Sequence, residues 1–143
     1  MTKPWRIKTA FDYIDWIADV IEEAGAVPVA PDYLDYDTFE VDEDVIEAHI
    51  GPQEIHFFDD GTRLSVDIWV DADGEVEQYE LHYMHDDGAG ICRLCLSDNH
   101  ITDVGQRSHM HPGGQKKAVA SDELDFDEAV KFLRALVQDA AST

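Results

Sequence analysis

The sequence predicts an α+β fold, an antiparallel β-meander of four to six strands with an N-terminal and a C-terminal helix packed on one face. Apolar residues recur at helical spacing near both ends of the chain, and they alternate with polar residues in the middle. Short turns separate the alternating segments, and such connections join antiparallel strands. Residues 1–143 have the length of one typical domain, so we expect a single domain.

The two helices are predicted over residues 9–24 and 126–139. Thr9 with Asp12 resembles a capping box for the first, and Asp125 is the expected cap of the second. Each helix has a single apolar face, so both can cover the same side of the sheet. The other side is then free for a ligand, a partner or a second copy of the chain, and it carries Trp69, His82 and Met84.

The sheet is predicted over residues 45–96. Its clearest strand is the alternating segment 64–70, and Gly51-Pro52 is expected to separate two shorter strands before it. Two loops flank the sheet. The acidic segment 26–44 is expected to be a solvated loop with a short strand near Phe39 and Val41. Residues 98–120 are expected to be an irregular, histidine-rich loop in which His109 and His111 are exposed.

The charge of the chain is extreme, because 32 acidic residues stand against 10 Lys and Arg for a net charge of −22. The carboxylates are dispersed, which favours adaptation to high salt, as in a halophilic archaeon or its virus or plasmid, where self-repulsion is screened. A mimic of nucleic acid that captures a basic partner is the alternative. No apolar run has the length of a membrane span, and the N-terminus lacks the apolar core of a signal peptide, so we expect a cytoplasmic protein.

The stretch 79–111 concentrates the residue types that perform chemistry, with five of the seven histidines and both cysteines. His109 and His111 have the spacing that suits acid–base work, phosphate binding or a metal, although two solvated histidines are the simpler interpretation. Asp98-Asn99-His100 could orient a histidine or form an ordinary turn. Arg93 is a candidate anion anchor or one half of a surface ion pair.

Zinc is the main cofactor to consider, with Cys92, Cys95, His109 and His111 as the full ligand set. The two cysteines lie in a predicted strand, where residues three apart point to opposite faces. This geometry disfavours a shared metal site, and small apolar core residues are the commoner role of cysteine. We therefore expect no cofactor and keep zinc as the alternative.

The order of the motifs resembles the TumE-like toxins of toxin–antitoxin modules over residues ~54–139. The motifs, in chain order, are Phe58-Asp59-Asp60-Gly61-Thr62-Arg63-Leu64, Tyr79-Glu80-Leu81-His82-Tyr83, a strand with Arg93, then Asp98-Asn99-His100, His109-x-His111 and a C-terminal amphipathic helix. Two features depart from the family pattern: Leu94 to Ser97 separate Arg93 from Asp98, and Met110 stands where another polar residue is expected.

The resemblance implies a toxin with an antitoxin partner, and the toxin context suggests RNA or another phosphate-bearing target. The implied polar positions are Tyr83, Arg93, Asp98, Asn99, His109 and His111, and we add His100 to the catalytic set and His82 beside Arg93 for substrate binding. The alternative is a non-enzymatic binding or assembly module that uses the free sheet face.

Overall fold

The computed structural model describes residues 4–141. Among these residues the chain forms an eight-stranded sheet in which neighbouring strands are antiparallel. The strands are β1 (Ala26–Pro28), β2 (Tyr36–Val41), β3 (Asp44–Phe57), β4 (Arg63–Asp71), β5 (Val76–Met84), β6 (Gly90–Leu96), β7 (Ser108–Pro112) and β8 (Val119–Ala120). The helices are α1 (Ala10–Glu23), α2 (Ile101–Val104) and α3 (Phe126–Ala141).

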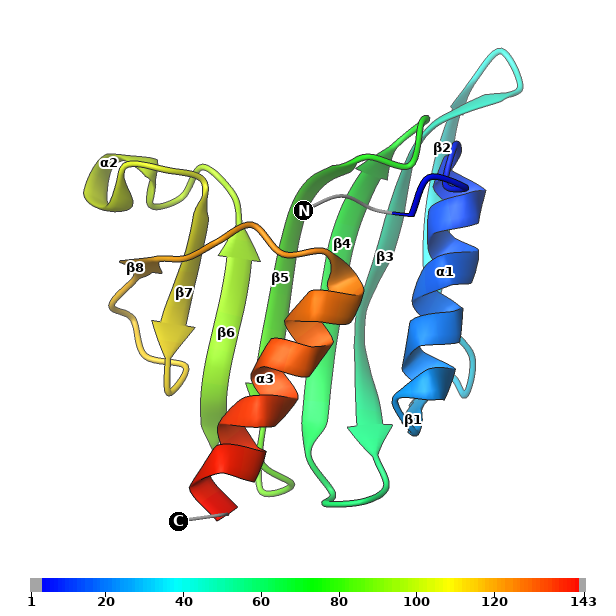
Figure 1. Ribbon diagram of the computed structural model, residues 1–143. Helices are drawn as coiled ribbons and strands as arrows, with labels where there is room; N and C mark the ends of the chain where they lie inside the picture. The colour runs from blue at the N-terminus through cyan, green and yellow to red at the C-terminus, as the bar shows by residue number, and fades with distance from the viewer. Residues whose placement is uncertain (1–3, 142–143) are drawn as a thin grey trace.

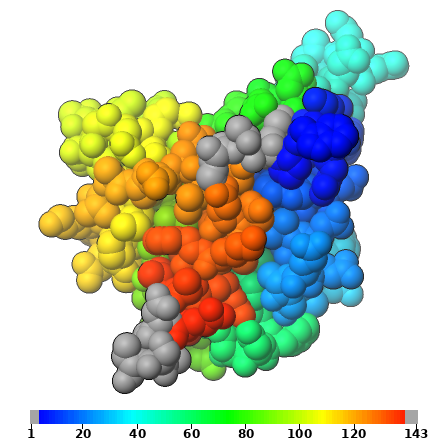
Figure 2. All heavy atoms as spheres, in the orientation of Figure 1, coloured from blue at the N-terminus to red at the C-terminus, as the bar shows by residue number. Residues whose placement is uncertain are grey.

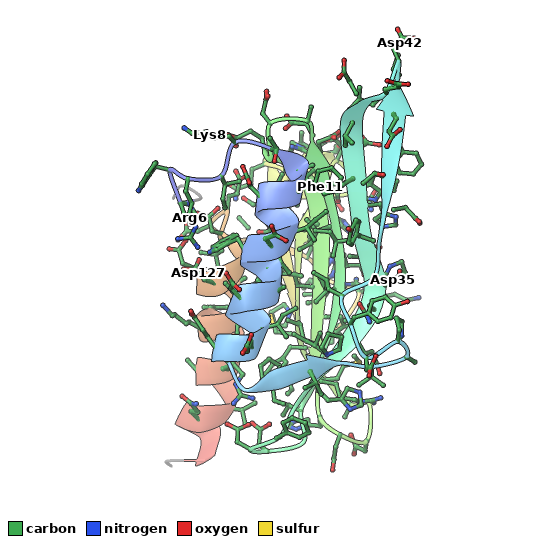
Figure 3. The ribbon with its side chains drawn as sticks, turned by 90° about the vertical axis from the view of Figure 1, so that its right-hand side faces the viewer. Arg6, Lys8, Phe11, Asp35, Asp42 and Asp127 are labelled. Carbon is green, nitrogen blue, oxygen red and sulfur yellow. The ribbon has the colours of Figure 1, made fainter. Side chains whose placement is uncertain are left out.

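The main path of the sheet runs β1-β3-β4-β5-β6-β7-β8, and β2 pairs with β3. Helices α1 and α3 lie on the same side of the sheet (Figures 1 and 3), which confirms the predicted α+β architecture. Figure 2 shows the segment around α2 as a lobe beside the helix-covered face. None of the described helices has the length and hydropathy needed to cross a membrane.

Local sequence explains the position of α1. The Asp12 amide donates to Thr9 Oγ1 at 3.1 Å, and the Thr9 amide donates to Asp12 Oδ2 at 3.2 Å, so the predicted capping box is present. Ile17 and Ile21 on the apolar face of this helix are buried in one core cluster with Leu81 of β5. That core, between the helices and one face of the sheet, is the reason why the helices cover that face only.

The acidic segment 26–44 contains more structure than predicted. Strands β1 and β2 both pair with β3, and only the expected short strand near Phe39 and Val41 is confirmed. Pairing satisfies the backbone of β2 while its acidic side chains stay in solvent, so the high charge is compatible with a strand at this edge.

Gly51-Pro52 does not end a strand, contrary to the prediction. β3 continues through it with a shift of register against β4 between Ile50 and Gln53. Gly51 has a φ of +84°, and a Cβ atom there would lie 2.0 Å from the Val66 carbonyl oxygen. Glycine therefore allows the irregularity that keeps the strand continuous.

The predicted loop 98–120 is also wrong in part, because it contains α2, β7 and β8. His109 and His111 are buried on β7 rather than exposed in a loop. The last helix ends at Ala141, two residues beyond the predicted 139. Strand β7 forms because β6 offers it a pairing edge, a long-range contact that local periodicity does not report.

Candidate functional site

The pairing of β6 with β7 brings the candidate residues together. Arg93 lies opposite His111, and Cys95 lies opposite His109. Their neighbour Leu94 belongs to the core under the helices, and side chains alternate along a strand. Arg93, Cys95, His109 and His111 are therefore on the face of the sheet that α1 and α3 do not cover, which we call the open face.

Cys95, His109 and His111 form a compact cluster on this face, with one ligand atom from each residue within 4.8 Å of the others. His100, from the turn before α2, adds a third imidazole, with its ring centroid 4.9 Å from that of His109 and 5.2 Å from that of His111. His109 and His111 are each only 1% exposed. We call Cys95, His100, His109 and His111 the histidine cluster.

Hydrogen bonds fix the protonation pattern of the rings. Nδ1 of His109 lies 3.1 Å from the Arg107 carbonyl oxygen, and Nδ1 of His111 lies 2.9 Å from the Gln115 carbonyl oxygen. A carbonyl oxygen only accepts, so each Nδ1 carries a proton and the neutral ring has its lone pair on Nε2. Burial lowers the pKa of His111, and the nearby positive charge of Arg93 lowers it further. Both effects favour the neutral ring.

Arg93 and His82 border the histidine cluster on its β5 side. Arg93 lies opposite His82, and its guanidinium is 3.5 Å from a carboxylate oxygen of Glu80. Within the described part of the chain, Arg93 Nε and His82 Nε2 are buried without a hydrogen-bond partner. Burial, followed by the charge of Arg93, lowers the pKa of His82. This border therefore offers donors that an anionic ligand could satisfy.

The Cys95 thiol lies within the same electrostatic environment. Burial, followed by the charge of Glu80, raises the pKa of Cys95 to about 11. The free thiol is consequently protonated near neutral pH. A shallow hollow on the open face runs beside Cys95 and is also lined by Trp69, Glu80 and Asn99.

Two residues predicted for the site lie elsewhere. Tyr83 is on the helix-covered face, where its hydroxyl is 2.7 Å from Thr62 Oγ1 and borders Arg134 of α3. Cys92 is a core residue on that same face. Alternation along β5 and β6 places both of them away from the histidines, and Cys92 cannot share a metal with Cys95.

The Asp98-Asn99-His100 triplet divides in a similar way. His100 joins the histidine cluster, whereas Asp98 accepts from Arg107 Nε at 2.9 Å. The backbone N–H of Asn99 donates to Ser97 Oγ at 3.4 Å, which is turn geometry. Asn99 otherwise only lines the hollow. The triplet thus delivers one ring to the cluster and otherwise forms the turn.

The distribution of charge along the chain marks the same region. Residues 88–121 contain four Lys or Arg and two acidic residues, a net charge of +2. The chain as a whole has −22, so the other residues have −24. This local reversal could have been found in the sequence, and it indicates an anionic ligand for the region that contains the histidine cluster.

Comparison with known proteins adds independent information about the chain. The sequence model of the family described as Toxin TumE matches residues 17–141, which covers the sheet, the histidine cluster and α3. No curated protein and no solved structure matches the chain. Because the family match extends over most of the 143 residues, this protein belongs to the TumE toxin family.

Proposed function

We propose that this protein is the toxin of a toxin–antitoxin pair and that it acts on RNA at the open face of β6 and β7. The observation that carries the proposal is the convergence of Arg93 and three histidines within residues 88–121, a region of positive net charge in a strongly acidic chain. Membership of a toxin family supports the biological role. The phosphate backbone of RNA supports the choice of target, because it is polyanionic.

Each group has a role that its surroundings support. Arg93 is partly exposed, has an unpartnered Nε and lies opposite His111, so it is the group beside the histidine cluster that is best placed to hold a phosphate. His82, its cross-strand neighbour, is the second candidate for that contact. His100 is partly exposed, whereas His109 and His111 lie beneath it. His100 is therefore the ring of the cluster that a large target reaches first.

The proposal is tested by inducing the protein in growing cells and following growth and RNA integrity together. Wild type is expected to stop growth and to produce new RNA 5′ ends soon after induction. His100→Ala should lose most of this effect. His56→Ala is the matched control, because His56 is also a partly exposed open-face histidine next to a carboxylate, with Nε2 3.4 Å from Glu54.

The outcomes separate the parts of the proposal. The toxin role is contradicted only when none of the hosts tested, including one with a salt-rich cytoplasm, shows growth arrest. Arrest with intact RNA contradicts the RNA target. Equal loss of arrest in His100→Ala and His56→Ala, at equal protein abundance, contradicts the location of the site.

A binding role for the hairpin of β2 and β3 is a second candidate function, and exposed apolar side chains favour it. Phe39 and Ile46 are 44% and 48% exposed, and Val41 is 53% exposed. The hairpin projects beyond the sheet with Asp42 at its tip (Figure 3). We propose this surface for the antitoxin or for a second copy of the chain. Light scattering in molar salt measures the mass of the protein alone, which tests self-association, and with a co-expressed antitoxin, which tests the complex.

A further inference from the structure

We propose that the histidine cluster is a metal site in which Cys95, His100, His109 and His111 bind one Zn²⁺ ion. Three of these residues already place one ligand atom each within 4.8 Å of the others. Zinc binds both thiolate and imidazole and takes four ligands, so one thiolate and three imidazoles can complete its coordination. The fourth ligand is thus His100, and Cys92 has no part in the site.

The hydrogen bonds of the rings are those of metal ligands. A histidine that binds a metal through one nitrogen usually donates its other N–H to a carbonyl or a carboxylate. Nδ1 of His109 and of His111 donates to a backbone carbonyl oxygen. Nδ1 of His100 lies 3.2 Å from the Asp103 carboxylate. All three rings can therefore present Nε2 to one ion, each already oriented by a partner.

The distances suit a small ion. Tetrahedral zinc with bonds of about 2.0–2.3 Å holds neighbouring ligand atoms roughly 3.3–3.8 Å apart. The ligand atoms of Cys95, His109 and His111 lie within 4.8 Å of one another. Side-chain rotations that move these atoms by about an ångström would therefore bring them to zinc-binding distances. The cysteine and the two β7 histidines come from directly paired strands, which makes this geometry rigid.

A bound ion would also account for the polar interior of this edge of the sheet. His109 and His111 are buried on the open face, although neither α1 nor α3 covers that face. Coordination by His100 would fasten the segment 97–107 over β6 and β7. The inference shares residues with the proposed toxin activity but does not depend on it, because metal binding is measured on the purified protein. Arg93 and His82 remain available to an anion when the rings are coordinated.

The experiment measures metal in untagged protein purified in molar salt from zinc-supplemented cells. Elemental analysis is expected to find one zinc per chain. Replacement by Co²⁺ should give the intense visible bands of a tetrahedral site together with a thiolate charge-transfer band. Cys95→Ser should lose the charge-transfer band, whereas Cys92→Ser, on the same strand but the opposite face, should keep it. His100→Ala should weaken zinc binding about 10–100-fold or more.

Wild-type protein without stoichiometric zinc after zinc loading overturns the proposal. Loss of the band in Cys92→Ser together with its retention in Cys95→Ser overturns the choice of cysteine, and unchanged affinity in His100→Ala overturns the fourth ligand. If Cys95→Ser fails to fold, X-ray absorption at the zinc edge of the wild type decides without a variant. The proposal predicts one sulfur and three nitrogen ligands, and any other count contradicts it.

Discussion

The two faces of strand β6 bury their side chains for different reasons. On one face, Cys92 and Leu94 contact the core under α1 and α3. On the other face, Cys95 and the paired histidines of β7 are buried although neither α1 nor α3 covers them, and the residues around them are polar. The first face is stabilised by apolar area removed from water. The second contains groups that are costly to bury, so it requires partners.

This difference teaches where to look for function in a small sheet protein. The helix-covered face needs no ligand to explain it. The open face has buried unpartnered nitrogens on Arg93 and His82 and a cluster of imidazole lone pairs in the described structure. Buried polar groups on a face that α1 and α3 do not cover thus indicate a functional site. Buried apolar side chains indicate only the core that stabilises the fold.

Substitutions of the adjacent residues Leu94 and Arg93 should show the largest difference in folding stability between the two faces. Leu94→Ala truncates a side chain that is 1% exposed, and it should lower the free energy of unfolding by about 2–5 kcal/mol. Arg93→Gln alters a partly exposed side chain with one 3.5 Å ion pair and should cost no more than about 1 kcal/mol. Urea denaturation in molar salt measures both. Equal costs would show that the open face is also part of the hydrophobic fold.

Salt should affect folding stability and RNA binding in opposite directions. Screening should raise the thermal midpoint of the whole chain, because its net charge is −22. The same screening should weaken binding of single-stranded RNA, roughly 5-fold per phosphate contact for each tenfold increase in salt. Thermal melts and filter binding across a KCl series test this. A midpoint that falls with KCl would contradict the effect of the acidic surface.

Tyr83→Phe tests whether Tyr83 belongs to the scaffold. It removes the hydroxyl that lies 2.7 Å from Thr62 Oγ1, and it should cost about 0.5–1.5 kcal/mol. Toxicity at equal abundance should be unchanged, because the side chain is on the helix-covered face. Denaturation and growth measured on the same variant decide the matter. Strong loss of toxicity with intact stability would return Tyr83 to the site.

The smallest effect is expected at Asp125, at the start of α3. Burial, then the charges of Glu128 and Asp127, raise its pKa to about 6, above the ordinary range of Asp. The charged form is thus disfavoured in the folded state, and this penalty is present at neutral pH and disappears as pH falls through 6 toward 4. Asp125→Asn should stabilise by a few tenths of a kcal/mol at pH 7, discounted for exposure, and by nothing near pH 4.

Melting temperatures of Asp125→Asn and wild type across that pH range provide the measurement. A gain that persists unchanged near pH 4 would mean that the carboxylate charge is not the cause.

Periodicity in the sequence was sufficient for much of the fold. Alternation predicted β4 and β5, and helical spacing predicted α1 and α3 nearly to their ends. Strand β7 lies in a predicted loop, and only part of β2 was expected, because their pairing with β6 and β3 is a long-range contact that compensates for polar or acidic side chains. Sequence spacing alone contains no such information.

The site was partly predictable for the same reason. His109 and His111 share a face because residues two apart on a strand do so, and the alternation argument correctly separated Cys92 from Cys95. His100 was a candidate from its triplet, but its position beside the β7 histidines depends on how the turn before α2 folds back over β7, which sequence spacing does not show. The positive net charge of residues 88–121 was available in the sequence and would have located the region directly.

The central claim is that function lies at Arg93 and the histidine cluster rather than elsewhere on the open face. Growth arrest by Arg93→Gln, compared with Arg63→Gln, tests it most directly. Both arginines are on the open face, each has a buried unpartnered Nε, and each lies 3.3–3.5 Å from a glutamate. At equal abundance, Arg93→Gln should lose toxicity and Arg63→Gln should keep it. Equal toxicity of the two variants, or the reverse pattern, would contradict the account.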